Sequence, residues 1–460
     1  MKRKAAFLSL IAAIILSLPV VMPMFASNGK WTYLAPENYQ IVAMPKNVPV
    51  VYNALQDKDM QKISEAKSGM FIENGVEVFD NTPTDINYDK AGRPDIVPPL
   101  RFKGITPENN LVDAQKEVFE ISYQDGEETE KVKIAKLTLG NQTIFTPAEP
   151  EYSPCGFIPS PDYSRFVLAT QKGLWLLEAG KPSANKISKD EFNGRTYNEL
   201  RSELQEKLAG IEGPATLWWN DNPIFSPDNS KIVYTTNRDC IESGGNSIWL
   251  YDLATGKEQP ITRDADGAHH RCEGWVDNEY IIYMKSTKGV NQYYITKIND
   301  KSKELKLEGE TPDILSMYGN IIAYTTDVFN QRNLRVVKID PENSSSDINF
   351  IYEKQFEGVL RQIMPHAFSP TGRNFSPDGS KLAYLYAPDS NETIMHIAII
   401  DLNTKEVTIL KEAPSKDGIR TVFHDFDWLD NQRLLVRVSR VVDGLNEISS
   451  WIYSEGNSSQ

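Results

Sequence analysis

Histidine, tryptophan and charged residues gather at a few points of this chain. Residues 269–273 read His-His-Arg-Cys-Glu, and residues 218–221 read Trp-Trp-Asn-Asp. An imidazole titrates near neutral pH and serves as an acid–base group or a metal ligand, whereas an indole ring can stack on a sugar or a peptide. These groups form one site only if the fold brings them together. The candidates are Trp218, Trp219, Asn220, Asp221, His269, His270, Arg271, Arg361, His366, Arg420, His424 and Asp425.

The chain lacks the short motifs of several common enzyme classes. It has no Gly-x-Ser-x-Gly nucleophile elbow, no His-x-His or His-Glu-x-x-His spacing, no P-loop and no Gly-x-Gly-x-x-Gly. Such motifs place a nucleophile, two metal ligands or a phosphate-binding loop on one element. The sequence therefore argues against a serine hydrolase domain and a nucleotide-binding domain, and we expect no bound metal or cofactor.

The charge balance argues against nucleic acid as a partner. The 460 residues include 49 Lys and Arg against 63 Asp and Glu, which gives a formal net charge of −14. A surface this negative repels phosphate backbones and anionic lipid headgroups. The share of apolar residues, 40%, is that of an ordinary globular protein.

The first residues predict export. Lys2, Arg3 and Lys4 precede an uncharged run over residues 5–26, and small residues follow at the junction with Ser27. This order is typical of a secretory signal peptide, here residues 1–27. The run is also long enough to cross a bilayer, so cleavage and retention as an anchor both stay open. Either way we expect an extracellular, periplasmic or cell-surface protein that touches a membrane only through that anchor.

A sequence unit of about fifty residues recurs through the last two thirds of the chain. Residues 223–234 contain Ser-Pro-Asp-Asn-Ser-Lys before an apolar strand, and residues 374–384 contain Ser-Pro-Asp-Gly-Ser-Lys at the same point. Residues 247–257 and 395–405 follow these with a strand that ends in Asp-Leu-x-Thr. Residues 158–168 are an earlier copy. Each unit predicts a four-stranded antiparallel meander, because Pro and Asp-Gly favour the tight turns between strands.

Three weaker copies complete the series, at residues 275–283, 318–324 and 428–436. The Ser-Pro-Asp-Gly turn and the strand ending in Asp-Leu-x-Thr-Gly resemble the WD40-like repeats of TolB-like β-propellers. The resemblance covers residues 150–460 and implies an all-β, six-bladed propeller that binds partners. Residues 28–149 do not share the repeat, and we interpret them as an irregular, β-containing segment with strands near residues 117–123 and 131–139.

Two further elements follow from the repeat pattern. The last copy stops after its third strand, so we expect residues 142–146 to add the missing outer strand and close the ring. Residues 189–210 carry Tyr197, Leu200, Leu204 and Leu208 at helical spacing, which predicts a helical insertion between the first two blades.

In a propeller the loops that precede the inner strands open at one mouth, where each blade donates side chains to a shared surface. We expect the ligand-binding residues there to be Trp218, Trp219, Asn220, Asp221, Arg271, Arg361, Arg420 and Asp425. Cys240 and Cys272 fall at the same mouth in adjacent blades, so we predict a disulfide between them, with Cys155 left as a thiol. The alternative is that all three cysteines are buried as small apolar residues.

The sequence thus favours an exported, monomeric, non-catalytic scaffold that binds a protein, peptide or glycan partner at the cell envelope. The alternative is a polysaccharide lyase- or hydrolase-type propeller enzyme that uses His269, His270, His366 and His424, with or without a bound metal. The two classes differ in how close these side chains must lie to one another. An enzyme needs several of them within reach of one point, and a scaffold does not.

Overall fold

The computed structural model describes the repeat region and parts of the segment before it. The described residues are 24–26, 29–35, 40–42, 50–53, 70–73, 76–79 and 101–456, the last range without residues 107, 126–127, 140–141, 148–155, 163, 171–172, 179–180, 182, 189–190, 193–194, 197–219, 241–244, 263–266, 329–330, 341–347, 357–373, 388–394 and 443–444. Regular structure in these residues is entirely β, and none of it is a helix of the length and hydropathy needed to cross a bilayer.

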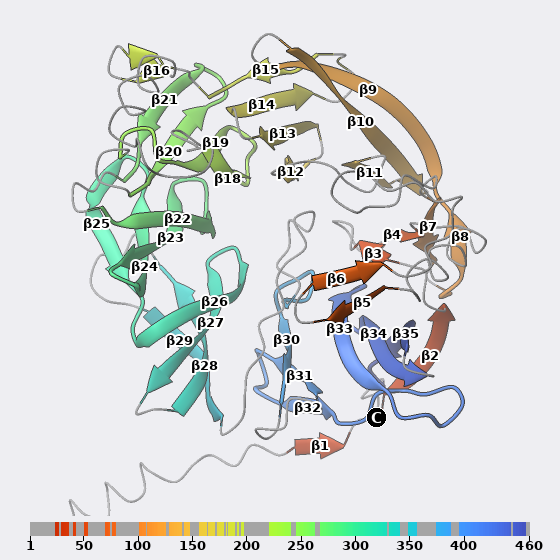
Figure 1. The fold of residues 1–460 in the computed structure, drawn as a ribbon. Helices are drawn as coiled ribbons and strands as arrows, with labels where there is room; N and C mark the ends of the chain where they lie inside the picture. The colour runs from red at the N-terminus through yellow and green to blue at the C-terminus, as the bar shows by residue number, and fades with distance from the viewer. Residues whose placement is uncertain are drawn as a thin grey trace, which may run out of the picture.

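The repeats fold into small sheets arranged around a common centre (Figure 1). We number them I to VI in chain order. Sheet I contains β12 (Gly156–Pro159), β13 (Arg165–Thr170), β14 (Gly173–Glu178) and β15 (Asn185–Lys186). Sheet II contains β18 (Asn220–Phe225), β19 (Lys231–Thr236), β20 (Ser247–Asp252) and β21 (Lys257–Pro260). Sheet III contains β22 (His269–Trp275), β23 (Tyr280–Thr287), β24 (Val290–Lys297) and β25 (Asp300–Lys306).

Sheet IV contains β26 (Glu310–Tyr318), β27 (Ile321–Val328), β28 (Gln331–Ile339) and β29 (Ile348–Phe356). Sheet V contains β30 (Lys381–Tyr386), β31 (His396–Asp401), β32 (Val407–Leu410) and β1 (Met24–Ala26). Sheet VI contains β33 (Val422–Trp428), β34 (Arg433–Val442), β35 (Leu445–Ser454) and β2 (Lys30–Ala35). Successive strands within the repeats pair antiparallel, and the sheets stand radially, so the prediction of an all-β propeller is confirmed.

The Ser-Pro-Asp turn has the same hydrogen bonds in each of its copies. In sheet II, Ser226 Oγ donates to Asp228 Oδ1 at 2.6 Å, and the amide and hydroxyl of Ser230 donate to the same oxygen at 3.0 and 2.8 Å. Lys231 N–H then donates to Ser226 Oγ at 2.9 Å. Equivalent bonds surround Asp162 and Asp378. These local bonds explain why the motif recurs within the chain, because each residue type satisfies a backbone or side-chain group of the turn.

These turns make part of the stability dependent on acid pH. Partial burial raises the pKa of Asp228, but the bonds from Ser226 and Ser230 and the charge of Lys231 outweigh it and lower the pKa from 3.8 to about 2. The unfolded chain therefore takes up the proton first as the pH falls, and the stabilisation is lost between pH 3.8 and about 2. We expect Asp228→Asn to remove this loss, which is about 1 kcal/mol or less for an exposed carboxylate. Thermal unfolding at pH 4.5 and 2.5 tests it, and an equal acid loss in the variant would contradict it.

Hydrogen bonds between sheets recur at matching repeat positions. Trp275 Nε1 on sheet III donates to the carbonyl of Ile224 at 3.1 Å, and Trp428 Nε1 on sheet VI donates to the carbonyl of Asn374 at 2.9 Å. Three positions after each tryptophan, Asn278 and Asn431 accept the amide of the preceding sheet's turn aspartate. The weaker copies at residues 275–283 and 428–436 therefore keep the residues that lock one sheet to the previous one.

The core lies between neighbouring sheets. Ile232, Tyr234 and Trp249 of sheet II pack with Val167 of sheet I, and corresponding clusters fill the spaces from sheet II round to sheet VI. Alternate residues of each strand point to the two faces, so both faces of every blade are apolar. A single blade cannot cover both faces, which is why the copies stack around a centre.

The predicted closing strand is wrong. Residues 142–146 lie in β11 (Gln142–Pro147), which pairs with β10 (Glu128–Leu139), whereas sheet VI is completed by β2. Only two residues separate β10 from β11, and such a short connection favours pairing of the two strands as a hairpin. Strand β2 presents Trp31 and Tyr33 to Tyr453 and Trp451, each ring pair 5.1 Å apart between centroids.

The segment before the repeats builds sheets of its own. Strand β9 (Gln115–Asp125) pairs with β10, and these strands contain the two predicted at residues 117–123 and 131–139. The sheet β11-β10-β9 meets sheet I, where Ala184 N–H donates to the carbonyl of Ser122 at 3.0 Å and the rings of Tyr123 and Trp175 lie 5.3 Å apart. Elsewhere β3 (Gln40–Val42), β4 (Val50–Asn53), β7 (Arg101–Ile105) and β8 (Leu111–Asp113) form one sheet, and β5 (Met70–Glu73) pairs with β6 (Val76–Phe79).

The predicted helix at residues 189–210 is not helical where it is described. Strands β16 (Glu191–Phe192) and β17 (Arg195–Thr196) form a short antiparallel hairpin at its start. The helical spacing begins only at Tyr197, and that residue and the three leucines lie outside the described residues.

Candidate functional site

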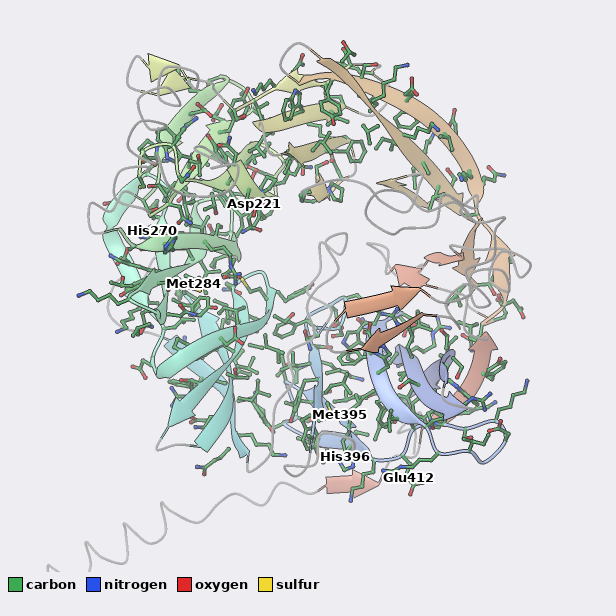
Figure 2. The ribbon with its side chains drawn as sticks, viewed as in Figure 1. Asp221, His270, Met284, Met395, His396 and Glu412 are labelled. Atoms are coloured by element: carbon green, nitrogen blue, oxygen red, sulfur yellow. The ribbon has the colours of Figure 1, made fainter. Side chains whose placement is uncertain are left out.

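Most of the predicted site residues that are described lie on the first strands of sheets II, III and VI or on the loop before them. Figure 2 shows Asp221 and His270 on the neighbouring sheets II and III. Trp218, Trp219, Arg361 and His366 lie outside the described residues, as does Cys155. The described ones are Asn220, Asp221, His269, His270, Arg271, Arg420, His424 and Asp425.

A bulge in β18 ties sheets II and III together. The pairing of β18 with β19 shifts between Asp221 and Ile224, and Asn222 has a φ of +50°, a conformation that Asn tolerates better than most residues. Asn222 N–H donates to Asp221 Oδ1 at 2.7 Å, and its side-chain amide donates to the carbonyl of Cys272 on β22. Asp221 is exposed, while Asn220 is buried and its Oδ1 has no hydrogen-bond partner in the described structure.

His270 has a structural role. Its ring is buried, and Nδ1 lies 2.8 Å from the carbonyl oxygen of Asn246. Its backbone N–H donates to Asn246 Oδ1, and its ring centroid lies 5.8 Å from that of Tyr283. His269 is exposed, because successive residues of a strand point to opposite sides. The two adjacent histidines therefore do not act together.

Arg271 belongs to a charged cluster between sheets III and IV. Its Nε and Nη2 both bond Glu273 Oε1, at 2.9 and 2.8 Å. Burial raises the pKa of Glu273, Arg271 opposes the rise, and the nearby charge of Asp313 on β26 adds to it. Burial and the same two carboxylates raise the pKa of Tyr293. Asp313 was missed by sequence reasoning, because it precedes the weak repeat at residues 318–324 and belongs to no motif.

The predicted residues of sheet VI do not extend this cluster. Asp425 is buried and bonds Arg437 on the neighbouring strand, so its carboxylate is held within the sheet. His424 is exposed, and Arg420 is exposed in the loop before β33. In that loop Asp417 pairs with Arg440.

The predicted disulfide is wrong, because Cys240 and Cys272 are separate thiols. Cys240 Sγ lies 3.1 Å from Ser247 Oγ within sheet II. Cys272 Sγ faces the carbonyls of Gly274 and Ile282, both at 3.7 Å, in the core between sheets II and III. Burial raises the pKa of the Cys272 thiol. The sequence placed both residues near one mouth but could not give the direction of their side chains.

No three His, Cys, Asp or Glu side chains of the described part come together in an arrangement that could hold a metal ion. Asp221, His269 and Arg271 are the predicted polar residues of sheets II and III that are exposed in the described part. They come from two strands joined by the Asn222–Cys272 hydrogen bond.

Comparison with known proteins gives partial similarities. No family model matches the chain. A stretch of 90 residues is 29% identical to the probable dipeptidyl-peptidase 5 of Emericella nidulans, and it spans 19% of this chain and 12% of that protein.

Solved propeller structures are also similar to this chain. TolB from Acinetobacter baumannii is 16% identical, with a TM-score of 0.30 over 74% of this chain and 79% of that one. The Dos1 propeller is 12% identical, with a TM-score of 0.39 over 94% and 96% of the two chains. One of two prolyl endopeptidases is 11% identical, with a TM-score of 0.43, and the chain spans half its length.

Proposed function

We propose that the protein is an exported, six-bladed β-propeller that acts as a non-catalytic recognition scaffold at the cell envelope. Its partner is a protein segment, peptide or glycan that binds at the mouth of the ring. The observation that carries the proposal is that Asp221, His269 and Arg271 are exposed on the first strands of the neighbouring sheets II and III. One hydrogen bond fixes these two strands against each other, which reduces the conformational freedom that binding would have to restrict.

The enzyme alternative needs converging acid–base groups, and the described residues favour the scaffold. His270 is engaged by Asn246, and Asp425 by Arg437. His269 and His424 belong to sheets III and VI, which are not neighbours in the ring (Figure 1). A general base must lie within hydrogen-bond reach of the proton it takes.

Binding to arrays of peptides and glycans tests the proposed surface. We expect Asp221→Ala and Arg271→Ala each to weaken binding to the best array ligand by about tenfold, as for a residue central to an interface. Lys131→Ala, on β10 and outside the first strands, is the matched control and should bind like the unmodified chain. Turnover of an array compound that is lost in His269→Ala would instead establish the enzyme alternative.

Export predicts a processed N-terminus. We expect the full chain, expressed with a C-terminal tag, to leave the cytoplasm and to begin near Ser27. Cell fractionation followed by N-terminal sequencing measures both. A tagged chain that stays in the cytoplasm would contradict the export proposal, and an exported chain that retains residues 1–26 would identify the anchor.

A further inference from the structure

Sheet V carries an additional strand at its outer edge. Strand β1 runs parallel to β32, with Met24 opposite Val407, Phe25 opposite Thr408 and Ala26 opposite Ile409. Strand β32 is already the last strand of its repeat. The added strand lies inside the segment predicted to be an export signal, whereas β2, which completes sheet VI, begins after it.

The edge that β1 covers differs in chemistry from the other long outer edges. Native sheets protect exposed edges with charged residues and proline. Strand β21 carries Lys257, Glu258 and Pro260, and β25 and β29 also carry charged residues. Strand β32 reads Val-Thr-Ile-Leu and has neither charge nor proline. Of these four edges, only β32 lacks charged residues and proline, and it is the one that pairs with an additional strand, β1.

The backbone of β32 is set to receive a strand. Asp401 N–H donates to the carbonyl of Glu406 at 3.0 Å. The alternation of an antiparallel ladder then turns the amide groups of Thr408 and Leu410 toward β31 and those of Val407 and Ile409 outward. Val407 and Ile409 are buried in the core between sheets IV and V, which holds this edge in one register. The added strand meets a preformed row of donors and acceptors.

We propose that the edge of β32 is a strand-addition site for an extended, uncharged segment of a partner protein. Residues 24–26 cover the edge in the unprocessed chain. Removal of residues 1–26, which rests on the export proposed above, takes β1 away and leaves β2 in place. The processed chain then pairs the open edge with the partner's segment through backbone hydrogen bonds, in the same parallel direction as β1.

A synthetic peptide of residues 21–28 with a fluorescent label tests the site. We expect saturable binding to the chain that starts at Ser27, measured by fluorescence anisotropy. Phe25 is the central residue of the parallel pairing, so N-methylation of its amide should weaken binding by about tenfold, equal to about 1.4 kcal/mol. The chain that keeps residues 20–26 should bind at least about tenfold more weakly, because its own segment competes at high effective concentration.

Several outcomes would overturn the inference. Equal binding of the N-methylated peptide would show that backbone pairing is not the mode. Concentration-dependent dimerisation of the Ser27 chain without peptide binding would assign the edge to a second copy. An exported chain that keeps residues 1–26 would leave the edge permanently covered. The array-binding tests of the Asp221 and Arg271 variants do not depend on these results. Failure of the strand-addition site and failure of the proposed mouth site can therefore be told apart.

Discussion

Glu258→Ala is expected to lower the free energy of unfolding by about 3–5 kcal/mol, because it leaves a buried arginine without its counter-charge. Arg238 and Glu258 form an ion pair at 3.2 Å, and their side chains are 1% and 2% exposed. Tyr234 also donates to Glu258, at 2.5 Å, and the Arg238 guanidinium lies 3.8 Å from the centroid of Trp249. The substitution therefore breaks a charge pair, a hydrogen bond and the packing of sheet II together. Urea-induced unfolding measures the change.

A half-exposed pair in sheet IV is the control for this prediction. Arg335 pairs with Glu353 at 2.7 Å, but the Glu353 side chain is 47% exposed. Glu353→Ala should cost below about 1 kcal/mol. Replacing both buried partners, Arg238→Met with Glu258→Leu, should recover part of the loss, since no charge is then left unpaired. Equal costs for Glu258→Ala and Glu353→Ala would show that burial does not set the energy of these pairs.

Trp31→Ala should destabilise the protein by about 2–4 kcal/mol, because it removes a large, half-buried ring that packs against the core between sheets V and VI. Trp31 packs against Tyr453 of β35, and its ring centroid lies 6.1 Å from that of Phe423 of β33, so it contacts two other strands of sheet VI on the same face. Loss of this ring loosens the contact between β2 and the last repeat. Thermal and urea unfolding measure the loss.

Thr143→Ala separates the observed closure from the one expected from sequence. Thr143 is exposed on β11, the strand first expected to close the ring. Its substitution should change stability by less than about 0.5 kcal/mol. A larger cost for Thr143→Ala than for Trp31→Ala would contradict closure by β2.

Local chemistry was predictable, and long-range pairing was not. The turn around Asp228 depends on residues within a few positions of it, so its sequence predicts its structure. Strand β2 pairs with the far end of the chain, and nothing near Trp31 marks its partner. The leucine spacing at residues 200–208 predicts a helix, but it does not indicate that the preceding residues form the hairpin β16–β17.

The candidate site divides in the same way. The run at residues 269–273 was recognised from its residue types, but the roles of its members depend on neighbours that come from other sheets. Asn246 holds His270, and Asp313 approaches Glu273 from sheet IV. The direction of their side chains also explains why Cys240 and Cys272 form no disulfide with each other. Sequence patterns locate such groups along the chain, and packing decides what they can do.

Completion of sheet VI by β2 has a consequence for the order of folding. Strand β2 must wait for β35, which lies in the last of the six repeats and is synthesised long after β2. Contacts between residues so distant in sequence form slowly, because the intervening chain must lose conformational freedom first. Until then β35 has an open edge. Pairing of β2 thus requires that synthesis has passed β35, and a chain cut short before that strand has no partner for β2 in sheet VI.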